Sequence, residues 1–320
     1  MEYRTATPAD EPALHALWTA AFPDPAPVIA LWSQDPGRHR RTFVAVDDGG
    51  RPVSVVHYQP RPIRSSTGEP QQVGCLGSVA THPEARGRGH VRRLLAAAVA
   101  TMTADGCAWS LLFTSTPAVY ENAGWRTFAA PGWSGPPADP APDRLAPAGP
   151  VTVRPAIPAD LPALQELRAT FDASRPLTTV RTAEDWQHRV PVWYAPPTET
   201  LLAETDPEAA PRPAGFLVVR HPRPGHVEIA EIALAPGHGA DVAGALFAFA
   251  GARARDVGAW GVGVRLPAVR AVREALPLLL AEVTAAPTRF GMARALGATV
   301  DEVVATVSAP GAVHWYGDSF

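Results

Sequence analysis

The opening of this chain is repeated 150 residues later. Residues 3–17 read YRTATPADEPALHAL and residues 153–167 read VRPAIPADLPALQEL, in one ungapped register. A repeat at a fixed spacing means that one folding unit occurs twice. Because 320 residues also suit two domains of about 150 residues each, the sequence predicts a duplicated fold.

Each copy opens with a short strand, a Pro-Ala-Asp turn and an amphipathic helix. Leu14, Leu17 and Trp18 fall at helical spacing and predict a stripe that faces the core. Asp10 and Asp160 stand at the N-cap position of their helices, where a carboxylate accepts hydrogen bonds from free amides. We therefore interpret both aspartates as structural.

A proline-rich stretch separates the two copies. Seven of the twenty residues 131–150 are proline, which prevents a helix and favours an extended chain. The sequence therefore predicts a catalytic domain over residues 1–130, a linker over 131–150 and a second domain over 151–320.

The rest of the first copy alternates strands and a helix. Strands are predicted over residues 41–47, 51–64, 71–81 and 107–115, and a helix over 91–106. This order predicts a mixed α/β (α+β) fold, in which each domain is a twisted sheet flanked by helices.

Composition excludes several classes of function. A formal net charge of −3 argues against a binder of nucleic acid or of anionic membranes, which carry a basic excess. No apolar signal segment or run of 18 apolar residues occurs, so we expect a cytoplasmic protein with Cys75 and Cys107 reduced. The cysteine and histidine spacing fits no metal site, so none is expected.

The most informative segment follows the predicted strand 71–81. It runs through Arg86-Gly87-Arg88-Gly89-His90-Val91 into a helix. The start of a helix offers free N–H groups and positive potential, and glycine lets the backbone approach a phosphate closely. The two arginines add charge, so the segment predicts a pyrophosphate site.

This segment resembles motif A of the GNAT acetyltransferases, Arg/Gln-x-x-Gly-x-Gly/Ala, which binds the pyrophosphate of acetyl-CoA. Val91 replaces the last small residue. A second resemblance is Tyr120-Glu121-Asn122-Ala123-Gly124-Trp125, similar to the Tyr-x-x-x-Gly-Phe signature of the same superfamily. It implies that Tyr120 protonates the departing CoA thiolate, a role that a phenol with a pKa near 10 can fill at neutral pH.

The short segment before Tyr120 and the second copy resemble the Eis-type tandem acetyltransferases, which acetylate amines including aminoglycosides. This likeness implies that the backbone of Ser78, Val79 and Ala80 binds the pantetheine arm and that Ser115 lines the CoA groove. It also implies that the carboxylate of the terminal residue, Phe320 here, accepts a proton in the active site. Eis-type chains carry a third domain, for which 320 residues leave no room.

Other polar residues near the motif have simpler interpretations. His57 fits a hydrogen-bonded histidine within a sheet better than a catalytic base. Glu69 could reach a substrate amine, and His82, Glu84 and His90 are expected to face solvent.

The second copy lacks the features that carry the chemistry. Its counterpart of the glycine-rich turn, within residues 231–249, has no arginine before the helix, and the region assigned as counterpart of Tyr120, residues 289–300, has no tyrosine. We expect no productive CoA site there, and a role as one wall of the acceptor pocket.

These observations predict an acyl-CoA-dependent N-acyltransferase, with acetyl-CoA as co-substrate and a small-molecule amine as acceptor. Three alternatives stay open: transfer from a bulkier acyl-CoA, a decarboxylase or cyclase on the same fold, and a CoA-binding scaffold without catalysis. The sequence does not fix the acceptor or the oligomeric state, and a homo-oligomer stays open.

Overall fold

The structure is a computed structural model that describes residues 1–139, 151–205 and 211–320. The chain divides into two compact units. Unit 1 consists of Met1–Phe128, Arg289–Val307 and Asp318–Phe320, and unit 2 of Ala129–Thr288 and Ser308–Gly317. Each unit is built on one sheet of seven strands with helices against it.

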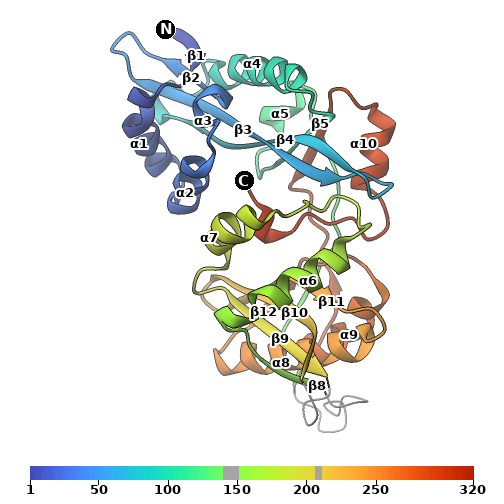
Figure 1. The fold of residues 1–320 in the computed structure, drawn as a ribbon. Helices are drawn as coiled ribbons and strands as arrows, with labels where there is room; N and C mark the ends of the chain where they lie inside the picture. The colour runs from blue at the N-terminus through green and yellow to red at the C-terminus, as the bar shows by residue number, and fades with distance from the viewer. Residues whose placement is uncertain (140–150, 206–210) are drawn as a thin grey trace. The chain divides into compact units, whose positions relative to one another are not determined.

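The sheet of unit 1 has the order β1-β2-β3-β4-β5-β14-β6; Figure 1 labels its first five strands, β1 to β5. Only β4 and β5 run parallel; all other neighbours are antiparallel. The strands are β1 Glu2–Thr5, β2 Thr42–Val46, β3 Pro52–Arg64, β4 Pro70–Thr81, β5 Trp109–Phe113, β14 Gly291–Ala295 and β6 Arg126–Thr127. The four strands predicted for the first copy are confirmed to within two residues at each end.

Helices cover both faces of this sheet. On one face, α4 packs through Leu94 and Leu95 onto Val56 of β3. On the other, the predicted stripe of α1, with Leu14 and Trp18, is buried against the opposite side of the same strands. The helices of unit 1 are α1 Glu11–Ala21, α2 Ala26–Gln34, α3 Arg38–Arg41, α4 His90–Ala104, α5 Ala118–Glu121 and α10 Val300–Val307.

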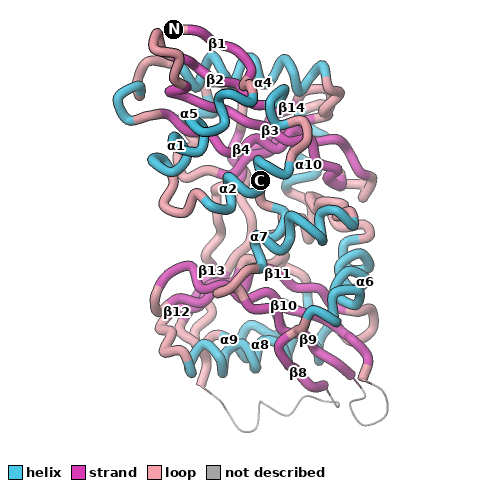
Figure 2. Tube along the Cα trace, turned by 60° about the vertical axis from the view of Figure 1, so that its left-hand side comes forward, coloured by secondary structure: helices cyan, strands magenta, loops and turns pink. Residues whose placement is uncertain are grey.

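Unit 2 repeats this plan with the order β8-β9-β10-β11-β12-β7-β13, in which only β11 and β12 run parallel. Figure 2 shows α8 and α9 along one face of this sheet. They bury Leu246 and Leu276 there, and α6 covers the other face with Leu164 and Leu167. The strands are β8 Val151–Pro155, β9 Glu199–Thr205, β10 Arg212–Arg223, β11 His226–Leu234, β12 Gly261–Val264, β7 Trp133–Gly135 and β13 Thr284–Ala285; the helices are α6 Leu161–Asp172, α7 Val190–Tyr194, α8 Gly239–Asp256 and α9 Arg270–Leu279.

The two halves of the sequence exchange strands, which corrects the predicted boundaries. β14, from the second half, lies beside β5 in unit 1, and β7, from the first half, lies beside β12 in unit 2. Part of the predicted linker is therefore a strand of unit 2, and residues 289–307 belong to unit 1. Residues 140–150 of that linker lie outside the described residues.

The repeated Pro-Ala-Asp turn has the same construction in both units. The Asp10 carboxylate accepts hydrogen bonds from the Thr7 N–H at 2.8 Å and from Arg4 at 2.7 Å, and Asp160 does the same with Ile157 and Arg154. The prediction that these side chains cap the following α-helices is wrong, because neither makes a capping hydrogen bond to its helix. Each carboxylate instead closes the turn and fixes the preceding strand, so its role is structural.

Candidate active site

The strands β4 and β5 separate where the predicted site lies. They pair only from Val73–Cys75 on β4 to Trp109–Leu111 on β5. β4 continues to Thr81, pairing with β3 on one side, and no described strand pairs with its other edge beyond Cys75. Main-chain polar groups need partners when they are buried, so this edge is suited to an extended ligand that supplies them.

The open part of β4 contains the predicted pantetheine-binding residues. β4 has a bulge opposite Val56. Val55 pairs with Ala80 and His57 pairs with Gly77, so Ser78 and Val79 together lie opposite the single residue Val56. Bulges bend a strand away from its neighbour.

Ser78 has a left-handed backbone with φ of 54°, which is unusual for a residue other than glycine. Its carbonyl accepts a hydrogen bond of 2.9 Å from the indole N–H of Trp18, so helix α1 holds the bulge in place. The sequence analysis placed Trp18 only in the core and missed this contact.

The predicted pyrophosphate loop lies at the start of α4. Gly87 and Gly89 both have φ of 75°, and a side chain on either would meet no atom within 4 Å. The glycines are therefore required by backbone conformation rather than by crowding. Among the described residues, none accepts a hydrogen bond from the main-chain N–H groups of residues 87–92.

Two positively charged arginines lie in the same loop as these free amides. Arg86 and Arg88 are exposed, and Arg86 donates a hydrogen bond of 3.3 Å to the Thr81 carbonyl. Helix α4 has 15 residues, so its N-terminus carries positive potential. Free N–H groups, a helix N-terminus and two arginines are together chemically suited to bind a phosphate or pyrophosphate.

His90 is buried rather than facing solvent, which corrects the prediction. Its side chain is 5% exposed, and the Tyr3 hydroxyl lies 2.8 Å from its Nδ1. Burial, followed by the charges of Arg88 and Arg93, lowers the pKa of His90, so its ring is neutral at pH 7. The histidine joins the first turn of α4 to strand β1 and positions the loop. Val91, next to it, is half-buried against the core of unit 1.

Tyr120 lies in the short helix α5 after β5. It is 7% exposed and packs in one cluster with Leu76 of β4 and Leu94 of α4. Burial raises the pKa of Tyr120 to about 12, so the phenol keeps its proton at any physiological pH. No described residue hydrogen-bonds to this hydroxyl. The side chain is therefore a neutral phenol in the same cluster as Leu76, the first residue of the open part of β4.

Phe320 also contacts strand β4. Its ring lies 6.1 Å from that of Phe113, at the end of β5. A Cβ placed on Gly77 would lie 2.6 Å from the main-chain oxygen of Phe320 and 2.9 Å from its carbonyl carbon. The carbonyl group of Phe320 therefore packs directly on Gly77, and this close approach requires glycine there. Sequence analysis did not single out Gly77.

The two groups approach β4 from opposite faces of the sheet. Leu76 points to the face covered by α4, where Tyr120 lies. The next residue, Gly77, points to the other face, because side chains alternate along a strand, and there it meets Phe320. The two sides of β4 near its separation from β5 thus carry a buried phenol, that of Tyr120, and the main-chain carbonyl of Phe320.

The remaining predicted residues fall outside this centre. Ser115 is exposed just after β5. His57 is buried and lies 3.0 Å from the Thr42 hydroxyl, as interpreted from the sequence. Glu69 precedes β4, at the end of the strand far from Gly77. His82 is half-buried and Glu84 is exposed.

Unit 2 repeats the fold around this site but lacks a counterpart of the tyrosine and of the two arginines. Residues 289–300, assigned from the sequence as the counterpart of Tyr120, lie instead in unit 1. Helix α9 follows β12 as α5 follows β5, and residues 265–279 contain no tyrosine. At the start of α8, Gly237 has φ of 85°, but no arginine flanks it.

The described residues contain no group of three or more histidine, cysteine or acidic side chains placed to hold a metal ion. None of the described helices has the length and apolar character needed to cross a membrane.

Comparison with known proteins agrees with this architecture. Residues 2–128 match a family described as an acetyltransferase (GNAT) domain, and no curated protein matches the sequence. Among solved structures, a GCN5-related N-acetyltransferase from Kribbella flavida has a TM-score of 0.68 at 21% identity, covering 92% of this chain and 71% of its own.

Two more structures are similar over both units. A probable N-acyltransferase from Enterococcus faecalis V583 has a TM-score of 0.67 at 15% identity, covering 92% of this chain and 73% of that one. Eis1 from Mycobacterium abscessus has a TM-score of 0.61 at 13% identity, with coverages of 92% and 74%. The predicted fold class, two tandem GNAT-fold domains with mixed sheets, is confirmed.

Proposed function

We propose that unit 1 transfers an acyl group, most simply acetyl from acetyl-CoA, to the amine of a small molecule, since residues 2–128 match a GNAT acetyltransferase domain. One observation carries this proposal. β4 and β5 separate beyond Cys75, where Leu76 shares a cluster with the buried phenol of Tyr120 and Gly77 contacts the main-chain oxygen of Phe320.

The loop and the strand divide the binding of the co-substrate between them. The N–H groups of residues 87–92, with Arg86 and Arg88, bind the pyrophosphate. The amide-containing pantetheine arm then pairs with the open edge of β4, as an extended peptide adds to a sheet. Its thioester reaches the bulge at Ser78 and Val79, where the N–H of Val79 or Ala80 polarises the carbonyl. Ser115, exposed after β5, borders the same groove.

The acid and the base act from opposite faces. The amine nitrogen attacks the thioester carbon, the C–S bond breaks, and the thiolate takes the proton of Tyr120. The α-carboxylate of Phe320 accepts the proton that the amine nitrogen loses. A carboxylate here also attracts a cationic amine, which suits acceptors such as aminoglycosides, and cytoplasmic acetyl-CoA supplies the acyl group.

Unit 2 contributes structure rather than a second active site. Its glycine-rich turn has no flanking arginine, and the strand position corresponding to the bulge of β4 is filled by a buried ion-pair cluster around Glu231. We therefore propose one acyl-transfer site per chain.

The test is release of free thiol from acetyl-CoA across a panel of amines, aminoglycosides included, with product masses. Tyr120→Phe should lower kcat by about 10²-fold or more and leave the Kd of CoA unchanged. Since burial raises the pKa of Tyr120 to about 12, its proton is not lost below pH 10, and no fall in rate from this group is expected between pH 7 and 10.

Tyr58→Phe is the matched control, since it removes another buried phenol of unit 1, bound to Asp105 at 2.6 Å. It should leave kcat unchanged. Wild-type turnover in Tyr120→Phe would exclude the assigned acid. CoA binding without thiol release on any amine would favour another acyl donor or a non-catalytic CoA-binding protein.

A further inference from the structure

Tyr120, the proposed acid, lies in a helix that is too short to be stable by itself. Helix α5 has four residues, and isolated helices of fewer than about 12 residues are marginal in water. The main-chain carbonyl of Tyr120 accepts hydrogen bonds from the N–H groups of Ala123 at 3.0 Å and Trp125 at 3.3 Å. These bonds close the turn that follows α5, but they do not attach it to the sheet. The position of the phenol therefore depends on contacts from neighbouring segments.

Arg294 of β14 supplies such a contact from the sheet. Met292 of β14 is buried in the cluster that contains Tyr120, and Arg294, two residues further along the strand, points to the same face. Its guanidinium donates a hydrogen bond to the main-chain carbonyl of Ala123 and lies 5.2 Å from the centre of the Trp125 ring. That ring meets the Tyr120 ring edge to face, at a centroid distance of 6.4 Å. Arg294 therefore connects the sheet to the turn that follows Tyr120.

The side chain of Arg294 lies closely along this turn. Gly124 has a left-handed backbone with φ of 94°, which glycine adopts freely. A Cβ at Gly124 would lie 3.4 Å from Arg294 Nε. The Trp125 side chain is buried, so the guanidinium is held between the main chain of the turn and a fixed aromatic ring.

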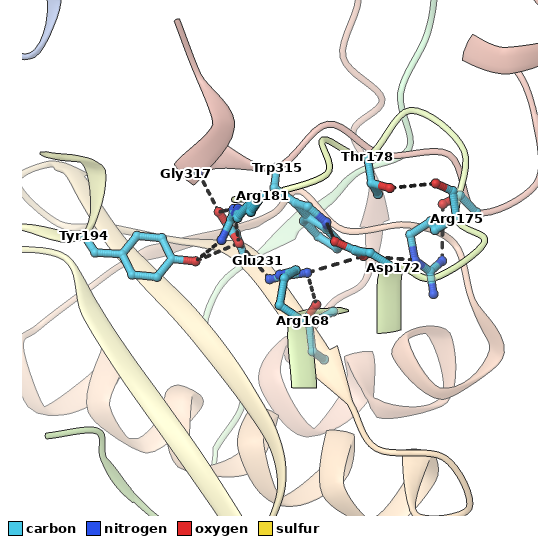
Figure 3. Close-up of polar contacts among 11 residues, drawn as sticks. Arg168, Asp172, Arg175, Thr178, Arg181, Tyr194, Glu231, Trp315 and Gly317 are labelled. Atoms are coloured by element: carbon cyan, nitrogen blue, oxygen red, sulfur yellow. Dashed lines mark hydrogen bonds and ion pairs between the residues drawn. The ribbon is translucent and has the colours of Figure 1, made fainter. Parts of the chain in front are cut away.

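The charge of Arg294 is not balanced by an acidic side chain. Buried charges are normally paired, as Arg168 and Arg181 of unit 2 are with Glu231, at 2.7 and 3.1 Å (Figure 3). Arg294 is half-buried, and no acidic side chain among the described residues forms an ion pair with it. Burial lowers the pKa of Arg294, because the guanidinium loses hydration there. Stability alone gives little reason for an arginine at this place, whereas its hydrogen bond to the turn does.

We propose that Arg294 is a positioning residue for Tyr120, because it holds the turn after α5 against the sheet and so fixes the place of the phenol. Arg294 lies outside residues 2–128, which match the GNAT domain. The second half of the sequence thus supplies a part of unit 1 that the acid requires. The inference rests on the proposed function, in which Tyr120 protonates the thiolate.

Three variants of the 320-residue chain separate positioning from a general loss of stability. Arg294→Met removes the hydrogen bond and the charge but keeps a long side chain, whereas Arg294→Lys keeps a charged donor. Arg64→Met is the matched control, because Arg64 is another half-buried arginine of unit 1 that donates to a main-chain carbonyl, that of Gly68, at 3.1 Å. Circular dichroism establishes that each variant is folded, and Arg294→Gln replaces Arg294→Met if the methionine variant does not fold.

The first measurement does not depend on catalysis. Ultraviolet absorption of phenolate, taken as the difference between a chain and its Tyr120→Phe version, reports the ionisation of this one tyrosine. Because burial raises the pKa of Tyr120 to about 12, roughly a tenth of this phenol is ionised near pH 11 in wild type.

In Arg294→Met the phenol should gain access to water, so its pKa should fall toward about 10 and the phenolate signal near pH 11 should rise at least about threefold. Arg64→Met and Arg294→Lys should match wild type. An unchanged signal in Arg294→Met, or an equal rise in Arg64→Met, would overturn the proposal, whatever the protein catalyses.

The second measurement links Arg294 to the reaction through a double-mutant cycle. Arg294→Met should lower kcat at least about tenfold and leave the Kd of CoA unchanged, and it should have no further effect in a Tyr120→Phe chain. Arg294→Lys should restore most of the rate. Additive losses would show a merely structural role and overturn the proposal. If wild type releases no thiol with any amine, the proposed function fails, while the phenolate signal still decides whether Arg294 positions Tyr120.

Discussion

Gly77→Ala is the most direct probe of the contact between β4 and Phe320. The substitution adds one methyl group to a strand residue. Since φ at Gly77 is not in the left-handed region, alanine suits the backbone. The new Cβ would lie 2.6 Å from the main-chain oxygen of Phe320 and 2.9 Å from its carbonyl carbon.

The distance by which the Phe320 carboxyl carbon must move determines how far kcat should fall. Non-bonded carbon atoms are stable at about 3.5–4.0 Å, so the Phe320 carboxyl carbon has to retreat by roughly 0.6–1 Å. A misplacement of about 1 Å can lower a catalytic rate by about 10²-fold. We expect kcat to fall by about 10- to 100-fold, which corresponds to about 1.4–2.7 kcal/mol.

Thiol release at saturating acetyl-CoA measures kcat, and calorimetry measures the Kd of CoA, which should not change. Gly74→Ala is the control, since it adds a methyl group three residues earlier on the same strand. There the new Cβ meets the flexible thioether of Met102, which can move aside. Wild-type kcat in Gly77→Ala, or an equal loss in Gly74→Ala, would refute the reasoning.

Two further predictions concern the loop and the repeated turn. Arg88→Gln should raise the Kd of CoA by about 10- to 100-fold, because one charged hydrogen bond is lost, and should leave kcat at saturating acetyl-CoA unchanged. The control is Arg51→Gln, in an exposed hairpin, and an equal rise in Kd there would contradict the assignment. Arg4 lowers the pKa of Asp10 from 3.8 to about 2, which is worth about 2 kcal/mol. That stability is present above about pH 5 and lost as pH falls toward 2. In urea unfolding, Asp10→Asn should therefore be less stable than wild type at pH 7, with a difference that shrinks in acid, whereas a difference independent of pH would contradict it.

Local patterns in the sequence predicted the elements around the site well. The repeat gave the strand, turn and helix that open each unit, because a Pro-Ala-Asp turn followed by an apolar stripe is determined by neighbouring residues. The loop at Gly87 and Gly89 was equally readable, since a left-handed backbone at both positions demands glycine.

Pairings between distant segments were not predictable from the same patterns. Strands β7 and β14 have three and five residues. A hydrophobic pattern this short does not predict which sheet a strand joins. Their exchange depends on partners more than 100 residues away, β12 and β5. Gly77 gave no signal either, because its neighbour, Phe320, comes from the far end of the chain.

One residue carried a signal for the buried ion pairs of unit 2 that the sequence analysis did not use. Arg168 stands 150 positions after Trp18 and follows Leu164 and Leu167 on the buried stripe of its helix. A charge on a core-facing stripe requires a buried partner of opposite charge. β11 supplies one acidic residue within its otherwise apolar end, Glu231, and the structure pairs the two at 2.7 Å.

The pair of positions 18 and 168 explains how one fold serves two purposes. In unit 1, the Trp18 indole binds the carbonyl of Ser78 and leaves the strand edge open. In unit 2, Arg168 binds the carbonyl of Ile232 at 3.0 Å and also needs Glu231 beside it. A ligand that displaced Glu231 would leave buried arginines without a counter-charge, at a cost of about 3–5 kcal/mol. The charged donor Arg168, in place of the neutral indole of Trp18, therefore keeps Glu231 at the strand position where we propose that unit 1 binds the thioester.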